Sequence, residues 1–143
     1  MKIYKVEEMT QRVVVAFERL MPQLAEDLKA PSEAYLEKMI DREDVNLFLA
    51  ELDDEIVGTV TLIINEMPSG RKGRIEDVIV DSAARGRGVA RQMMDAVIDF
   101  AKAEGLEKID LTSNPIRVAA HKLYDACGFV KRDTTVFRLE IKN

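Results

Sequence analysis

A strand, a glycine-containing loop and an amphipathic helix follow one another in the middle of the chain, and this order constrains the fold more than any other feature. The strand is the run RIEDVIV (residues 74–80), and the loop contains the stretch RGRG (residues 85–88). Apolar residues with helical spacing then extend from Val89 to Phe100, and Gly105 supplies a helix stop. A helix that follows a strand in this way packs back onto the sheet, so the segment predicts a mixed α/β domain.

The elements predicted on either side complete one domain. They are a strand at 2–6, helices at 10–28 and 32–43, a hairpin at 45–64, a loop at 67–73, a strand at 108–113, a helix at 114–128, and one or two strands at 129–141. At 143 residues the chain has the length of a single domain, spanning residues 1–143. The predicted fold class is α/β, with a mixed central sheet, flanking helices and the order β-αα-βββ-α-β-α-β.

Composition and charge argue against several classes of protein. The net charge of −5 argues against a general binder of nucleic acid or of an anionic membrane. No apolar run approaches the ~18 residues of a membrane span, and the charged N-terminus MKIYKVEEMT lacks the apolar segment of a signal peptide. We therefore expect a cytoplasmic protein without nucleic-acid or membrane partners. Cys127 is the only cysteine and no histidine cluster is present, so we expect neither a disulfide nor a bound metal.

Two phosphate-binding motifs share the strand, loop and helix layout but do not fit this loop. The NTPase motif ends in Gly-Lys-Ser/Thr, whereas here the loop ends in Gly88, Val89 and Ala90. The dinucleotide motif G-x-G-x-x-G opens the first βαβ unit of a domain, and its third glycine is replaced here by Arg91. The first motif is therefore absent, and the second is matched only weakly.

The loop nevertheless has the chemistry of an anion-binding site. A helix N-terminus presents unpaired N–H groups and a partial positive charge, and Gly86 and Gly88 let a phosphate approach the backbone without a Cβ in the way. Residues 69–92 contain six basic and three acidic side chains, a net charge of +3 in an acidic chain. Taken alone, this pattern also fits a solvated basic loop with a glycine cap; as a binding site, it predicts a polyanionic ligand.

Two motifs in this order point to one family. RGRGVA (residues 85–90) matches the signature (Gln/Arg)-x-x-Gly-x-(Gly/Ala), and R-x-x-A-x-x-L-Y-x-x-x-G-F runs from Arg117 to Phe129. Together they resemble the GCN5-related N-acetyltransferase (GNAT) superfamily. The resemblance implies acetyl-CoA as the acetyl donor and a divergence of the strand before the loop from the next strand. It assigns pantetheine contacts to the backbone of Val78, Ile79 and Val80, and diphosphate contacts to Arg85, Gly86, Arg87, Gly88, Val89 and Ala90.

Transfer of an acetyl group from a thioester to an amine needs a base for the amine and benefits from a proton donor for the leaving thiolate. The family's donor position corresponds to Tyr124. RIEDVIV resembles the Leu/Ile-Glu-Asp strand of polyamine and aminosugar members, which makes Glu76 the candidate base and Asp77 a candidate for substrate binding. A β-bulge would change which carboxylate faces the cleft, so the choice between the two stays open.

The last predicted helix also carries weaker candidates. Asn114 caps it and is a candidate contact of the pantetheine arm, whereas Arg117 stands where many relatives have Asn. By helical spacing, Tyr124 lies on a stripe next to the buried one. The residues expected on the buried stripe are Ile116, Ala119, Leu123 and Ala126.

The sequence therefore predicts an acetyl-CoA-dependent N-acetyltransferase that acts by direct transfer to a primary amine, and we expect a small-molecule acceptor. The same fold also suits acetylation of protein lysines or N-terminal amines, or a non-catalytic acyl-CoA-binding module. Family members often dimerise through their C-terminal strands, which makes a homodimer a candidate by analogy.

Overall fold

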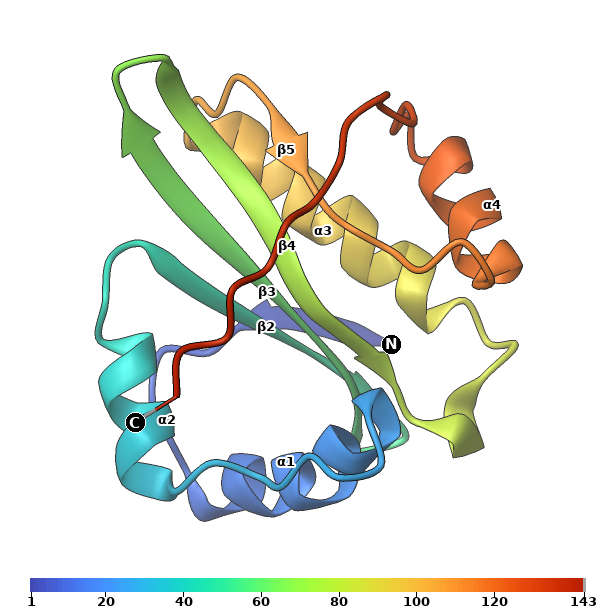
Figure 1. Cartoon of the computed structure of the whole chain (residues 1–143). Helices are drawn as coiled ribbons and strands as arrows, with labels where there is room; N and C mark the ends of the chain where they lie inside the picture. The colour runs from blue at the N-terminus through green and yellow to red at the C-terminus, as the bar shows by residue number, and fades with distance from the viewer. Residues whose placement is uncertain (143) are drawn as a thin grey trace.

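The computed structural model describes residues 1–142 and contains a five-stranded sheet with helices on both faces (Figure 1). The strands lie side by side in chain order: β1 (Lys2–Lys5), β2 (Val45–Leu52), β3 (Glu55–Met67), β4 (Gly70–Val80) and β5 (Ile109–Asp110). Neighbours from β1 to β4 are antiparallel, and β5 runs parallel to β4. This mixed sheet with flanking helices confirms the predicted α/β fold class.

The helices cover the sheet from opposite sides (Figure 1). Helices α1 (Gln11–Leu24) and α2 (Glu33–Ile40) pack on one face. Helix α3 (Val89–Ala103) packs on the other face, and α4 (Val118–Ala126) contributes to the same core. A short 3₁₀ turn, η1 (Ser82–Ala84), lies between β4 and α3. Among residues 1–142, no helix is both long enough and apolar enough to cross a bilayer.

Each face of the sheet has its own apolar core. Leu62 and Met93 are fully buried on the α3 face, and Leu20 and Leu49 are fully buried on the α1/α2 face. Full burial of side chains of this size contributes about 1.5–3 kcal/mol each. Gly58 makes room on β3 for Met93, whose sulfur would lie 3.0 Å from a Cβ at that position. The two cores together hold β4 between α1 and α3.

Local signals predicted several elements correctly. Helix α1 begins after Thr10, whose side chain accepts a hydrogen bond from the N–H of Val13 (3.4 Å), and it ends two residues after Pro22. The β2–β3 hairpin turns at Asp53 and Asp54, whose φ angles of 52° and 64° lie in the left-handed region. Two-residue hairpin turns of this kind favour Asp, Asn and Gly.

The helix predicted at 114–128 begins later than expected. Asn114 closes a separate turn, because its side-chain oxygen accepts from the N–H of Ile116 (3.0 Å) and its carbonyl accepts from the N–H of Arg117 (3.0 Å). The helix α4 therefore begins at Val118. Its end agrees with the prediction, since Gly128 follows with φ of 96°.

Other predicted bounds are also wrong. The strand predicted at 108–113 is formed only at Ile109–Asp110, and the helix predicted at 10–28 ends at Leu24. The loop predicted at 67–73 is shorter, because β4 already begins at Gly70. The final strand predicted at 129–141 is not formed, and Phe137 and Leu139 are 90% and 82% exposed. A strand needs a hydrogen-bonded neighbour along its length, and the edge strand β5 offers only two residues.

Candidate active site

Strands β4 and β5 separate soon after they meet. They pair only at Gly73 with Ile109 and at Arg74 with Asp110. Over residues 75–80, β4 keeps its ladder with β3 but has no strand on its other side within the described residues. This is the divergence that the resemblance implied, and it leaves backbone groups of β4 free to pair with an extended ligand.

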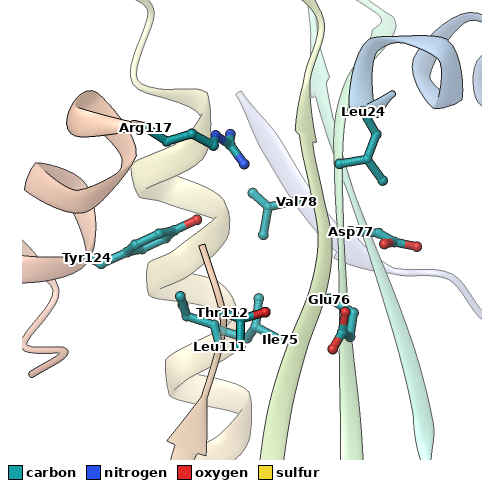
Figure 2. A pocket seen from close by; sticks show the side chains of 9 residues that line it. All are labelled: Leu24, Ile75, Glu76, Asp77, Val78, Leu111, Thr112, Arg117 and Tyr124. Atoms are coloured by element: carbon teal, nitrogen blue, oxygen red, sulfur yellow. The ribbon is translucent and has the colours of Figure 1, made fainter. Parts of the chain in front are cut away.

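A cavity of about 160 Å³ lies where the strands separate (Figure 2). Its walls come from the end of α1, from β4, from the segment after β5 and from α4. The lining residues are Leu24, Ile75, Glu76, Asp77, Val78, Leu111, Thr112, Arg117 and Tyr124. Two carboxylates, a guanidinium and a phenol therefore border one small space. Within residues 1–142, no three His, Cys, Asp or Glu side chains are grouped so that they could hold a metal ion.

A β-bulge at Asp77 shapes the acidic end of the cavity. The register between β3 and β4 shifts between Thr59 and Thr61, so Val60 faces two residues of β4, Asp77 and Val78. Asp77 has φ of 51°, in the left-handed region that Asp and Asn adopt more readily than most residues. The extra residue interrupts the alternation of side chains along the strand.

The side chains around the bulge divide between the two faces of the sheet. Ile75 and Val78 pack with the core under α3, whereas Ile79 packs with the core under α1 and α2. Glu76 alternates with Ile75 and so lies on the α1/α2 face. There its carboxylate forms an ion pair with Arg74. Glu76 therefore has a cation at ion-pair distance, although both side chains are more than a third exposed and water screens the pair.

Asp77 and Tyr124 border the cavity from opposite sides of β4 (Figure 2). Asp77 lies on the same side as Leu24 of α1, and Tyr124 lies on the same side as Arg117. The hydroxyl of Tyr124 and the guanidinium of Arg117 both point toward Val78. The cavity therefore connects the two faces of the sheet at one point along β4.

The Asp77 side chain is exposed at the mouth of the cavity. The cavity walls cover part of the side chain, and this burial raises the pKa of Asp77 above the usual range of an aspartate. The negative charge of Glu76 adds to the shift. Within the part of the chain that the structure describes, Asp77 has no cation at ion-pair distance, whereas Glu76 has Arg74. A proton therefore binds Asp77 more readily than it binds an ordinary aspartate.

Tyr124 is the buried residue of α4, at 8% exposed. The predicted buried stripe is wrong at three of its four positions: Ile116, which precedes the helix, is 82% exposed, and Ala119 and Ala126 are exposed as well. The Tyr124 ring packs edge-on against Phe129, with centroids 6.0 Å apart. Burial raises the pKa of the phenol, although the charge of Arg117 opposes this shift. The hydroxyl thus keeps its proton at neutral pH.

The conformation of the loop between η1 and α3 depends on its glycines. Gly86 and Gly88 have φ of 77° and 76°, a conformation that costs most other residues about 1–2 kcal/mol. Gly88 is the N-cap of α3 and has no side chain to bond the first-turn N–H groups, which stay available to a ligand. A Cβ at either glycine would meet no atom within 4 Å, so the space beside the turn is open.

Three arginines surround this turn. Arg85 and Arg87 are exposed on the loop, and Arg87 lies 3.7 Å from Asp53 of the β2–β3 turn. Arg91, in the first turn of α3, forms an ion pair with Asp95 at 3.2 Å. Exposed pairs of this kind contribute little in water, so these arginines can turn toward the phosphates of a ligand at low cost.

The predicted donor-binding residues differ in what they can contribute. Val78 lines the cavity, whereas the side chains of Ile79 and Val80 pack into the cores and leave only their backbone for a ligand. Asn114 does not line the cavity, and its side-chain oxygen bonds the N–H of Ile116. A contact of Asn114 with the pantetheine arm would therefore have to lie outside the cavity.

Five lining residues were missed or doubted by the sequence analysis: Leu24, Ile75, Leu111, Thr112 and Arg117. Arg117 lines the cavity even though its role was in doubt. Leu24 and Thr112 carry no signal that separates them from other loop and helix-end residues. The one related signal was Pro22, since the end of α1 near this proline brings Leu24 to the cavity.

Comparison with known proteins identifies the family. The model of the acetyltransferase (GNAT) family matches residues 11–129. The chain therefore belongs to the GNAT family of acetyltransferases, as the sequence resemblance predicted.

Two curated relatives show how the chain compares in length. Human N-acetyltransferase 8B is 30% identical over 94 residues, which cover 64% of this chain and 41% of that protein. Glucosamine 6-phosphate N-acetyltransferase 1 of Oryza sativa subsp. japonica is 36% identical over 64 residues, which cover 45% of this chain and 37% of that protein. The matches thus span about two fifths of the length of these relatives.

Solved structures show the same fold. An aminoglycoside acetyltransferase from an uncultured soil metagenomic sample, in complex with trehalose, has a TM-score of 0.86 at 20% identity, over 99% of this chain and 96% of that chain. Glucosamine-6-phosphate N-acetyltransferase from Arabidopsis thaliana has a TM-score of 0.82 at 23% identity, over 96% and 97% of the two chains.

Asp77→Asn should raise the free energy of unfolding at neutral pH. Because the pKa of Asp77 is raised in the folded state, its ionised form costs stability above that pKa, and the cost disappears below the unfolded-state pKa of about 4. We expect a gain below about 1 kcal/mol in urea unfolding at pH 7, since the side chain is exposed, and none at about pH 3.5. Asp54→Asn, at another left-handed position, is the control and should change stability little. A gain from Asp77→Asn that is equal at both pH values would contradict this assignment.

Proposed function

We propose that the chain is an N-acetyltransferase that transfers the acetyl group of acetyl-CoA directly to a primary amine of a small molecule. The observation that carries the proposal is the cavity at the separation of β4 from β5, which joins Tyr124 on one side of β4 to Asp77 on the other. Membership of the GNAT family supports the same activity.

The glycine loop and the open edge of β4 fit acetyl-CoA, which supplies the acetyl group as a thioester when it is bound. First-turn N–H groups of α3, together with Arg85 and Arg87, would hold the diphosphate. The backbone of residues 78–80 would pair with the pantetheine arm. The open space beside Gly86 and Gly88 supports this fit, because no protein atom stands where the phosphates would approach.

Tyr124 is our candidate for the proton donor. Its hydroxyl points into the cavity, and burial keeps the phenol protonated at neutral pH. Within residues 1–142, no side-chain hydrogen bond contributes to the pKa of this phenol, so its hydroxyl is free to donate to the departing sulfur. This role agrees with the one that the family resemblance implied.

Asp77 is our candidate for the base, in place of Glu76. The bulge sets Asp77 at the mouth of the cavity without a cationic partner, whereas Glu76 is paired with Arg74. A primary amine has a pKa of about 10 and is mostly protonated at neutral pH. An anionic wall first binds this ammonium, and Asp77 then accepts a proton from it. The neutral amine attacks the thioester carbonyl, the new C–N bond replaces the C–S bond, and the sulfur leaves as a thiol. Glu76 contributes negative charge beside the acceptor.

The acceptor would approach from the α1/α2 face, where Leu24 and Asp77 border the cavity. A cavity of about 160 Å³ suits the amine end of a small molecule. Two similar proteins, named as a glucosamine 6-phosphate N-acetyltransferase and an aminoglycoside acetyltransferase, support the same class of acceptor.

Gly88→Glu should abolish the binding of CoA and leave the fold intact. The added carboxylate repels the diphosphate and occupies the space beside the turn, which holds no protein atom. The matched control is Gly105→Glu, because Gly105 follows the other end of α3, has φ of 72° and also adjoins open space. Calorimetry with CoA should detect binding to the parent and to Gly105→Glu only. Equal affinity of a folded Gly88→Glu protein would contradict the assignment.

The activity itself is tested by the release of free thiol from acetyl-CoA with a panel of primary amines that includes glucosamine 6-phosphate and an aminoglycoside. Tyr124→Phe keeps the ring packing but removes the proton, so turnover should fall by roughly 10²–10⁴ while CoA affinity is kept. Tyr4→Phe is the control, because the Tyr4 hydroxyl bonds Glu51 at 2.9 Å outside the cavity. CoA binding without thiol release from any amine would favour a binding module.

Asp77→Asn and Glu76→Gln should differ in their pH–rate profiles. Asp77→Asn should lower the rate about 10²-fold near neutral pH, and the loss should shrink at higher pH as the amine loses its proton to solvent. Glu76→Gln should act mainly on the KM of the acceptor, because it removes a charge but not the base. A severe, pH-dependent loss in Glu76→Gln with a mild effect in Asp77→Asn would return the role of base to Glu76.

A further inference from the structure

A polar cluster around the buried carboxylate of Asp81 joins the last turns of α1 to the start of the glycine loop. Asp81 follows β4 and is only 8% exposed, although it carries a charge. One carboxylate oxygen accepts a hydrogen bond from Nε of Arg19 at 2.9 Å. The other accepts from the N–H of Ala83 at 3.1 Å and from the side-chain amide of Gln23 at 3.4 Å. Side chains of α1 therefore bond both carboxylate oxygens of Asp81.

Gln23 and Arg19 extend these contacts to the backbone. The side-chain oxygen of Gln23 accepts from the N–H of Ser82 at 2.8 Å. The guanidinium of Arg19 also donates to the carbonyl of Ile56 on β3. The first N–H groups of η1 are therefore satisfied by Gln23 and Asp81, and η1 is fixed to α1 before the chain reaches Arg85. We call Arg19, Gln23 and Asp81 the anchor cluster.

The charge of Asp81 would oppose an anionic ligand if it stood alone. The hydrogen bond from Ala83, together with those from Arg19 and Gln23, holds the pKa of Asp81 below its usual range, so the carboxylate is ionised at neutral pH. It lies at the start of the segment whose glycines and arginines fit a diphosphate. Arg19 cancels this negative charge, because it is the cation paired with Asp81.

We propose that the anchor cluster positions the phosphate-binding loop, and that Arg19 neutralises a charge that would otherwise weaken the binding of the diphosphate. The inference rests on the proposed function in one respect, which is that residues 85–90 bind CoA. The cluster also links two parts of the site, because Leu24 directly follows Gln23 and lines the cavity. One turn of α1 therefore supports both the loop and the acceptor side.

Arg19→Met tests the proposal because it removes the cation and leaves Asp81 uncompensated. In calorimetry, CoA should bind about tenfold more weakly, the size expected for one partly screened charge near an anion. Pantetheine lacks the phosphates, and its affinity, measured by NMR titration, should stay at the parent value. The double variant Arg19→Met/Asp81→Asn should recover most of the CoA affinity, because the uncompensated charge is gone.

Arg12→Met is a matched control. Arg12 lies two turns earlier on α1, and its guanidinium also bonds a carboxylate, that of Glu51, and a backbone carbonyl, that of Asp54 in the β2–β3 turn. Neither partner belongs to η1 or to the glycine loop. Arg12→Met should therefore bind CoA with the affinity of the parent, whatever stability it loses.

Three results would overturn the proposal. They are unchanged CoA affinity in Arg19→Met, equal loss of CoA and pantetheine affinity, and no recovery on adding Asp81→Asn. If Arg19→Met does not fold, Gln23→Met replaces it at a partly exposed position, with an expected loss of about threefold for CoA and none for pantetheine. A parent protein that binds no CoA would overturn the proposed function itself. That outcome differs from the three results above, in which the parent binds CoA and only the role of the anchor cluster fails.

Discussion

Strand β4 has a long antiparallel ladder with β3 but pairs with β5 only at Gly73 and Arg74, and the site depends on the edge left open beyond them. Unpaired N–H and C=O groups at a sheet edge bind another extended chain readily. Here the gap is bordered by α4, whose Tyr124 lines the cavity. The edge can therefore serve as a binding surface for an extended ligand whose reactive end reaches Tyr124.

The bulge at Asp77 places a carboxylate beside this edge. In a regular strand, Asp77 would take the place that Val78 occupies, in the apolar core under α3, where an unpaired carboxylate is costly. The extra residue moves Asp77 to the mouth of the cavity and lets Val78 fill the core. Because Asp accepts a left-handed φ at small cost, the bulge needs no glycine. The sheet then separates a carboxylate on one side from a phenol on the other.

Local signals predicted the glycine loop, the hairpin turn and helix α3, because each depends on residues close together in the sequence. They failed toward the C-terminus for two physical reasons. Asn114 uses its own turn to satisfy the backbone, so α4 begins at Val118. The apolar alternation after Phe129 has no neighbouring strand, and pairing, unlike helix formation, cannot be satisfied within one segment.

The sequence by itself determined the fold class, the left-handed turn at Gly86 and Gly88 and the supply of carboxylate, phenol and arginine groups, since these follow from residue type and local spacing. Only the tertiary structure decided that Asp77 sits on a bulge and that Glu76 pairs with Arg74, because the bulge is a matter of register between two strands. It also decided the burial of Tyr124, which depends on packing against elements far away in the chain. The same holds for the pairing of Arg19 with Asp81, which are 62 residues apart and meet only because α1 packs across the end of β4.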